Sequence, residues 1–466
     1  MASRSLQTQM TGVEITGQNL ANVNTTGYSR QRVQISASPD IITSVGPEGT
    51  GADATAIQQI VSNLLNNQIQ SQSSTSGYWN SQQSALQSAQ NALGEFLNGS
   101  GATAGTSATG ATDTTNTGLS AQLSSFFSAF SALASSASDS NKQAAVSAGQ
   151  QLATTFNNLN TQFSNVKNSL NDSLNNDVSS ANKLLTDIAS LNQEISSAEF
   201  TGGNANDLRD TREQDLENLS QLTNITTSSG SNGAVNITVG GQTLVSGNSV
   251  SDTLQTYDAG GGQLLVRTAT GGVNLTLTGG SMQGTIDARD GTLATMQNSV
   301  NNLAGTLITQ VNAIHNSGYN SAGGTGNTFF TGTNAATIGV NSALVNNAGL
   351  LQVSSSATLS GDTSLALQIS QLSSATQSSL NNQTFGDSYD STVATLGDAL
   401  NTANTQVSDQ SAVSSMLQTQ RGSISGVNVD EEMTNMLTFQ RAYQASAQVV
   451  TTVNTMLGDL LSMKTS

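Results

Sequence analysis

Two amphipathic helix patterns at opposite ends of the chain place the strongest constraint on its fold. The first occupies residues 4–22 and the second residues 430–462, with more than 400 residues between them. In the second pattern the apolar positions alternate in steps of three and four over more than three heptads, which is the repeat of a coiled-coil seam. Such a seam needs a partner helix, and the candidates are the other terminus or a neighbouring subunit. The seam positions are Leu6, Met10, Val13, Gly17 and Leu20 in the first helix, and Met436, Phe439, Tyr443, Ser446, Val450, Val453, Leu457 and Leu460 in the second.

Composition narrows the function classes. The chain has 466 residues, room for about three domains of ordinary size. Charged residues make up 9% of it, and 30 acidic against 13 basic residues give a net charge of −17, which argues against binding to nucleic acid. The absence of Cys excludes disulfides, thiol catalysis and thiolate metal sites.

Targeting segments are not evident in the sequence. No apolar segment of the secretory type follows the first Met, so we expect any export to use another route. No stretch approaches 18 apolar residues, and we therefore expect no membrane span.

The hydrophobic period changes along the chain and predicts its domains. Helical periods cover about 54–97, 119–200, 206–222, 286–315 and 366–421, whereas 223–285 alternates with a period of two. Paired glycines at 240–241 and 279–280 resemble hairpin turns, and the Gly-rich stretch 98–118 reads as a surface loop. We expect a mainly α, nested multidomain fold. Its parts are a terminal domain (1–35 with 425–466) whose helices pair as an antiparallel coiled coil, a long-helix bundle (36–222 with 286–424, irregular with short strands at 319–365) and a small antiparallel β domain inserted at 223–285.

Residues that could carry chemistry are few. The lone His315 ends a helical stripe, and a zinc site needs three or four ligands. The charged group in 207–215 (Asp207, Asp210, Arg212, Glu213 and Asp215) fits a solvated helix face. The acidic run Asp430, Glu431 and Glu432 fits the positive end of a helix dipole. We therefore predict no catalytic, cofactor-binding or metal-binding residues.

The terminal helices have no clear surplus of stability by themselves. Burying one large apolar side chain contributes roughly 1.5–3 kcal/mol, whereas ordering each residue costs more than about 1 kcal/mol. We predict that both ends are disordered or marginal in the monomer and fold on assembly.

Two terminal segments resemble a known family. The segment LANVNTTGYSRQRV (20–33) resembles the N-terminal signature of bacterial flagellar rod, hook and hook-associated proteins. Residues 425–461 resemble their C-terminal signature, in the version found in the hook-associated protein 1 family of hook–filament junction proteins. The Ser29-Arg30-Gln31 run also fits that family better than rod or hook proteins, where Lys commonly follows the Tyr. Internal segments at 206–214 and 311–319 are similar to the same family.

The resemblance implies a structural junction protein without enzymatic activity or cofactors. Members are exported unfolded through the flagellar type III apparatus and assemble helically outside the cell, with the terminal helices lining the inner tube. The implied partners are further copies of the chain, the hook protein, the second hook–filament junction protein and a cytoplasmic export chaperone that holds the C-terminal region. Neither nucleic acid nor a membrane span is implied. The chain is shorter than many members and has a single small β insert.

The resemblance also assigns roles to particular residues. Asn22, Asn24, Gly27 and Tyr28 should shape the turn that leaves the first helix. Two alternatives stay open: another axial component, hook or distal rod, and a secreted enzyme carried by the β insert, although that insert has no His and few paired acids. The residues expected to pack the terminal helices on each other and on neighbours are Leu6, Met10, Val13, Leu20, Met436, Phe439, Tyr443, Val450, Val453, Leu457 and Leu460.

Overall fold

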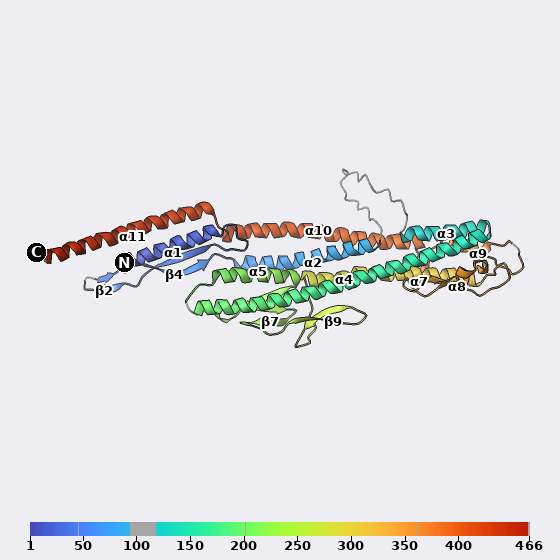
Figure 1. The fold of residues 1–466 in the computed structure, drawn as a ribbon, viewed down its shortest axis with the longest axis horizontal. Coiled ribbons are helices and arrows are strands. Elements are labelled where there is room, and N and C mark those ends of the chain that lie inside the picture. The colour runs from blue at the N-terminus through green and yellow to red at the C-terminus, as the bar shows by residue number, and fades with distance from the viewer. Residues whose placement is uncertain (45, 94–117, 201, 360, 465–466) are drawn as a thin grey trace.

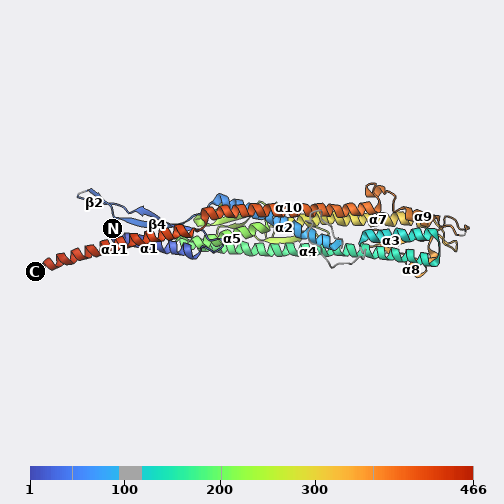
Figure 2. The same cartoon turned by 90° about the horizontal axis from the view of Figure 1, so that it is seen from above.

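The computed structural model describes residues 1–44, 46–93, 118–200, 202–359 and 361–464. Long helices run along a narrow rod, and both chain termini lie in the same half of it (Figures 1 and 2). The expected surface loop at 98–118 lies outside the described residues, apart from Gly118.

One end of the rod is built from segments at both ends of the sequence. Helices α1 (Ala2–Ala21) and α11 (Val429–Lys464) lie side by side and antiparallel, which confirms the predicted pairing of the terminal helices (Figure 1). An antiparallel ribbon lies against α1, and the Thr8 hydroxyl donates to the Ala52 carbonyl oxygen at 2.9 Å. We call α1, this ribbon and α11 the terminal unit. The ribbon consists of β1 (Gln31–Ala37) paired with β4 (Ala52–Gln59), and of β2 (Ile41–Thr43) paired with β3 (Gly46–Glu48).

The helix expected from residue 54 is wrong over its first residues. Residues 52–59 are strand β4, in which Ile57 pairs with Val33 of β1, and α2 begins only at Asn63. A short apolar run fits either period, and the neighbouring strand decides between them. Residues 36–59, which the sequence placed with the bundle, therefore lie in the terminal unit.

The rest of the rod is a bundle of long helices. Both prolines lie in the ribbon region, at Pro39 and Pro47, so none interrupts a helix, and α4 runs for 62 residues. A π-helical segment, Ala288–Leu293, joins α6 to α7. The bundle helices are α2 (Asn63–Leu93), α3 (Leu119–Ser135), α4 (Asp139–Phe200), α5 (Asn206–Leu222), α6 (Gly280–Asp287), α7 (Ala294–Asn316), α8 (Ser342–Asn346), α9 (Ser364–Gln371) and α10 (Phe385–Ser425), and a two-stranded pair, β11 (Phe330–Thr331) with β12 (Gly339–Val340), lies among them.

Two large apolar cores hold the bundle, and a small third cluster of Leu65, Ile69 and Leu417 joins α2 to α10. The first lies at the end far from the terminal unit and contains a phenylalanine cluster, in which the Phe329 and Phe330 ring centroids are 4.7 Å apart. The second lies between α4, α5 and the inserted strands.

The β insert follows α5. Gly240 and Gly241 have φ of +54° and +81° and form the tight turn predicted between β6 and β7. The second predicted hairpin turn is wrong, because Gly280 begins α6. Glycine is required at this position, since a Cβ would lie 2.4 Å from the Leu222 carbonyl carbon. The four-stranded sheet has the order β5 (Ile225–Ser229), β6 (Val235–Val239), β7 (Gln242–Ser246) and β8 (Ser249–Val250), and a separate hairpin pairs β9 (Leu254–Asp258) with β10 (Leu264–Thr268).

Candidate assembly surface of the terminal helices

The seam between α1 and α11 is made by small and polar side chains. The buried residues of α1 are Thr8, Gly12, Ile15, Thr16 and Asn19, a set that lets the two backbones approach closely. Three contacts mark the seam, each seven residues from the next on both helices, as an antiparallel heptad pairing requires: the Ser5 and Ser446 hydroxyl oxygens at 2.9 Å, Gly12 against the Phe439 ring, and the Asn19 amide donating to Glu432 Oε2 at 3.0 Å.

The apolar stripe predicted on α1 lies beside this seam. Leu6, Val13 and Leu20 are half-buried, and Met10 is 54% exposed. The ribbon and α11 together cover the polar face, since both make hydrogen bonds to it. Of the apolar stripe, only Met10 is exposed.

The predicted stripe on α11 is covered over only part of its length. Met436, Phe439, Ser446 and Val450 are half-buried, whereas Tyr443 is exposed. Beyond Val450 the helix extends past the first residue of α1, and every side chain from 451 to 463 is exposed; we call these residues the distal segment. Its apolar side chains are Val453, Met456, Leu457, Leu460, Leu461 and Met463, with exposures between 47% and 75%.

The turn after α1 is built largely by the residues predicted for it. Gly27 has φ of +83°, a conformation that favours glycine. The Asn22 amide donates to the Gln18 carbonyl oxygen at 3.0 Å, and Asn24 is exposed. Burial and nearby carboxylates raise the pKa of Tyr28 to about 12, so its hydroxyl remains a donor.

Asn19 is the buried centre of this turn, and the sequence reasoning missed it. Its Oδ1 accepts from the Tyr28 hydroxyl at 2.9 Å and from the Gln31 backbone N–H at 3.0 Å. Its Nδ2 donates to the Gln31 carbonyl oxygen at 2.8 Å as well as to Glu432. The only signal in the sequence was the residue type: asparagine is unfavourable inside a helix, and Asn19 stands two positions before the last residue of α1.

The acidic start of α11 does more than complement the helix dipole. Asp430, Glu431 and Glu432 all lie in its first turn. Glu431 pairs with Arg30 at 2.7 Å, and Glu432 is 4% exposed where it receives Asn19. The start of α11 is thereby tied to both α1 and the turn that follows it.

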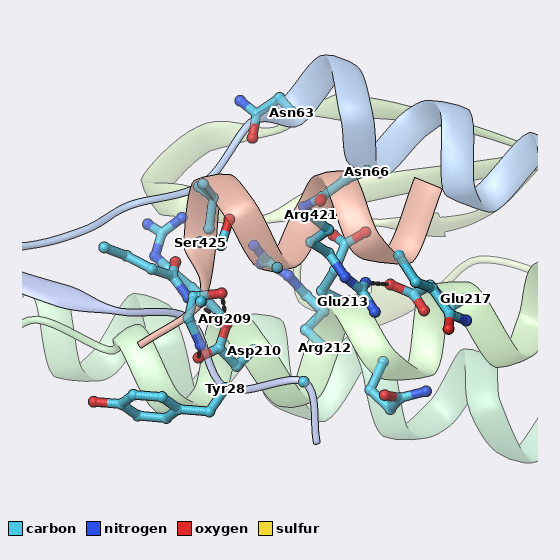
Figure 3. A pocket seen from close by; sticks show the side chains of 18 residues that line it. Tyr28, Asn63, Asn66, Arg209, Asp210, Arg212, Glu213, Glu217, Arg421 and Ser425 are labelled. Atoms are coloured by element: carbon cyan, nitrogen blue, oxygen red, sulfur yellow. Dashed lines mark hydrogen bonds and ion pairs between the residues drawn. The ribbon is translucent and has the colours of Figure 1, made fainter. Parts of the chain in front are cut away.

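The expectation of a solvated face on α5 is wrong for Asp210, Arg212 and Glu213. Asp210 accepts from the Ser29 backbone N–H at 2.9 Å and from its hydroxyl at 2.7 Å, and burial raises the Asp210 pKa to about 6 (Figure 3). Arg212 is buried, donates to Asn192 Oδ1 at 2.8 Å, and has its pKa lowered to about 10 by burial. Burial also raises the pKa of Glu213.

His315 is buried among hydrogen-bond partners in the bundle. Its Nδ1 lies 2.7 Å from the Asn327 carbonyl oxygen, and its Nε2 accepts from the Gln352 backbone N–H at 3.1 Å. Burial lowers its pKa to about 4, which keeps the ring neutral. Across the described ranges no group of three or more His, Asp or Glu side chains is arranged to hold a metal ion. Within the same ranges, every helix lacks the combination of length and hydropathy needed to cross a bilayer.

Comparisons with known proteins converge on one family. The profile of the flagellar hook-associated protein FlgK helical domain matches residues 109–330, and that of the flagellar basal body rod FlgEFG protein C-terminal region matches residues 418–463. The chain is 27% identical to flagellar hook-associated protein 1 of Bacillus subtilis, over 99% of this chain and 97% of that protein. The same-named protein of Salmonella typhimurium is 39% identical over 18% of this chain and 15% of its own length.

A solved structure shares the fold. The flagellar hook junction protein FlgK from Burkholderia pseudomallei aligns with a TM-score of 0.64 at 18% identity, over 77% of this chain and all of that one. The whole-length relative and the helical-domain profile both carry the name of flagellar hook-associated protein 1 or FlgK. The chain therefore resembles flagellar hook-associated protein 1 over nearly its whole length, and the comparisons support a structural role in the extracellular bacterial flagellum.

Proposed function

We propose that this chain is the subunit that joins the hook to the filament, and that copies of it assemble through their terminal helices without catalysing a reaction. The observation that carries this proposal is the distal segment, a continuous helix about 20 Å long whose apolar side chains are exposed. An exposed apolar surface of this extent marks an interaction site.

The proposed packing uses two surfaces of the terminal unit. The first surface is the distal segment, which continues the face of α11 that α1 covers before Val450. The second surface is on α1, where the apolar side chain of Met10 is exposed. A copy placed alongside would cover both surfaces, and because they differ, the contact is head-to-tail and builds a helical array. Each large apolar side chain removed from water in this way contributes roughly 1.5–3 kcal/mol.

The proposed partners are further copies of the chain, the hook protein, the second hook–filament junction protein and an export chaperone at the C-terminal region. An exposed apolar helix also explains why a chaperone would be needed, since the distal segment would associate non-specifically in the cytoplasm.

Deletion of the gene tests this function. We expect cells that assemble hooks without filaments and release flagellin into the medium, and we expect the full chain to restore filaments when supplied again. Normal filaments on the deletion strain would overturn the junction role and favour another position along the axial structure.

A further inference from the structure

The joint between the terminal unit and the bundle lacks an apolar core. None of the buried apolar clusters formed by the described residues contains a side chain of α1, the ribbon or α11. Ile15 and Val33 are buried, but outside these clusters. A small, polar interface between two parts of a chain permits them to move relative to each other, whereas a large apolar interface suppresses this motion.

Side chains at the start of α5 and the last residue of α10 make the hydrogen bonds that hold the joint. Arg30 donates its backbone N–H to the Ser425 carbonyl oxygen at 2.8 Å. Three polar side chains of α5 bond to α1, the turn and the ribbon, and Figure 3 shows one of them, Asp210. The contacts are Asp207 accepting from Gln31 at 2.8 Å and from Gln18 at 3.2 Å, Asp210 accepting from Ser29 and Gln59, and Asn206 donating to Gln31 at 3.0 Å and to the Ile57 carbonyl oxygen at 3.1 Å.

Two chain connections cross the joint, and water has access to it. The connections are residues 60–62 and residues 426–428. A cavity of about 240 Å³ lies between them, lined by Tyr28, Asp210, Arg421 and Gly426 among others, and on one side Arg421 pairs with Glu217 (Figure 3). Because water in such a cavity can replace lost hydrogen bonds, separating the two parts costs much less than opening an apolar core.

We infer that this joint is a latch: the terminal unit releases from the bundle as one body by exchanging its hydrogen bonds to Asn206, Asp207 and Asp210 for water, while both apolar cores stay packed. The release follows from contacts within one chain and does not depend on the proposed function. For a subunit placed between two unlike structures, as proposed above, it lets the helix pair adopt a different angle to the bundle.

Hydrogen exchange of the full chain tests the latch in dilute solution, where no assembly is required. The variant Asp207→Ala/Asp210→Ala removes the carboxylates, and Asp172→Ala/Asp398→Ala removes two exposed carboxylates elsewhere on the bundle helices as a matched control. In the first variant we expect the backbone amide of Arg30, which donates across the joint to the Ser425 carbonyl oxygen at 2.8 Å, to exchange about tenfold faster or more, because hydrogen bonds to charged groups are lost. Amides bonded inside α1, between β1 and β4 or inside α11 should keep their exchange rates, because a body released as a whole retains these bonds. Amides of α4 and α7 should be unchanged, and the control should match the parent.

Unchanged exchange of the Arg30 amide would overturn the latch. Acceleration of the amides bonded inside α1 and α11 would also overturn it, because it would show unfolding of the terminal unit rather than its release as one body. Ser29→Ala provides a second variant that acts from the terminal side and leaves α5 intact. It should accelerate exchange of the Arg30 amide to a smaller extent, and it decides the matter if the double variant also disturbs α4. Because monomers are measured, a negative result here is separate from any defect in hook–filament joining.

Discussion

At the scale of single residues, the close approach of α1 and α11 depends on small and polar side chains at their contact. Gly12 lies where a Cβ would come within 2.6 Å of the Phe439 ring, and Asn19 satisfies both its oxygen and its nitrogen at a buried position. A hydrophobic pattern marks large apolar side chains and is silent about such positions. The sequence therefore indicated the right two helices but did not identify the small and polar positions at which they meet.

Gly12 and Gly17 provide a matched pair of substitutions on α1. Gly12→Ala should destabilise the α1–α11 pairing by about 1–3 kcal/mol through overpacking against Phe439. Gly17 has open space around its Cβ position, so Gly17→Ala should stabilise α1 by about 0.5–1 kcal/mol through helix propensity. Hydrogen exchange of α1 amides measures both, and equal effects of the two substitutions would contradict the packing of Gly12.

His315 makes stability depend on pH. Its folded pKa of about 4 is below the ordinary value of 6.5, so between these values the unfolded chain binds a proton that the folded chain does not. This contribution is complete above pH 6.5 and is lost as pH falls toward 4, by about 3 kcal/mol at most. The raised pKa of Asp210, about 6, acts in the opposite direction, because the folded chain binds that proton more readily.

The imidazole signal separates the two effects, since the chain has one His. We expect nuclear magnetic resonance to show no titration of His315 between pH 5.5 and 8. A midpoint near the ordinary value would show that the ring is solvated, contrary to its burial here.

At the scale of elements, long periodic segments were predictable and short ones were not. The boundaries expected for α5, residues 206–222, agree with the structure because a glycine-rich break precedes the helix and the period changes after it. Strand β4 was taken for helix because Ile57, Ile60 and Val61 follow the helical spacing of three and four residues. What decides in favour of a strand is the pairing with β1, a tertiary contact that local spacing does not contain.

The distal segment leads to a prediction about α11. Leu457→Asp/Leu460→Asp should change the free energy of unfolding of the monomer by less than about 0.5 kcal/mol, because both side chains are exposed. The same variant should fail to restore filaments in a deletion strain, since assembly would bury two charges without partners. Thr455→Asp, an exposed polar position on the same segment, is the control for added charge.

Restored filaments with Leu457→Asp/Leu460→Asp would show that these side chains stay in water in the flagellum. Failure of Thr455→Asp to the same degree would attribute the defect to charge alone, and the apolar surface would then lose its assigned role.

At the scale of the whole molecule, the nested order of the chain was predictable from its ends. Two helices with unpartnered seams, separated by the rest of the chain, satisfy each other most simply by pairing, and α1 with α11 confirms it. The polar joint to the bundle was not predictable, because Asp207, Asp210 and Glu213 carry the ordinary spacing of a solvated helix face. The partners of Asp207 and Asp210 lie in the turn and the ribbon, and Glu213 accepts from Gln70 of α2; all of these are distant in sequence.

The low stability expected for the terminal unit predicts where a protease cuts the monomer. We expect trimming at both termini while the bundle survives, because the distal segment is uncovered and the terminal unit contributes nothing to the apolar cores of the described bundle. Mass spectrometry of the fragments locates the cuts. Full resistance of both termini would refute the marginal stability assigned to them.

The central claim is that the distal segment is bare in the monomer and covered in the flagellum. Because the chain has no Cys, Leu457→Cys introduces a single thiol at a 52% exposed position. The account predicts rapid labelling by a maleimide in the monomer, protection in isolated hook–filaments, and full labelling again after these are dissociated. Equal labelling in the monomer and in intact hook–filaments would contradict it.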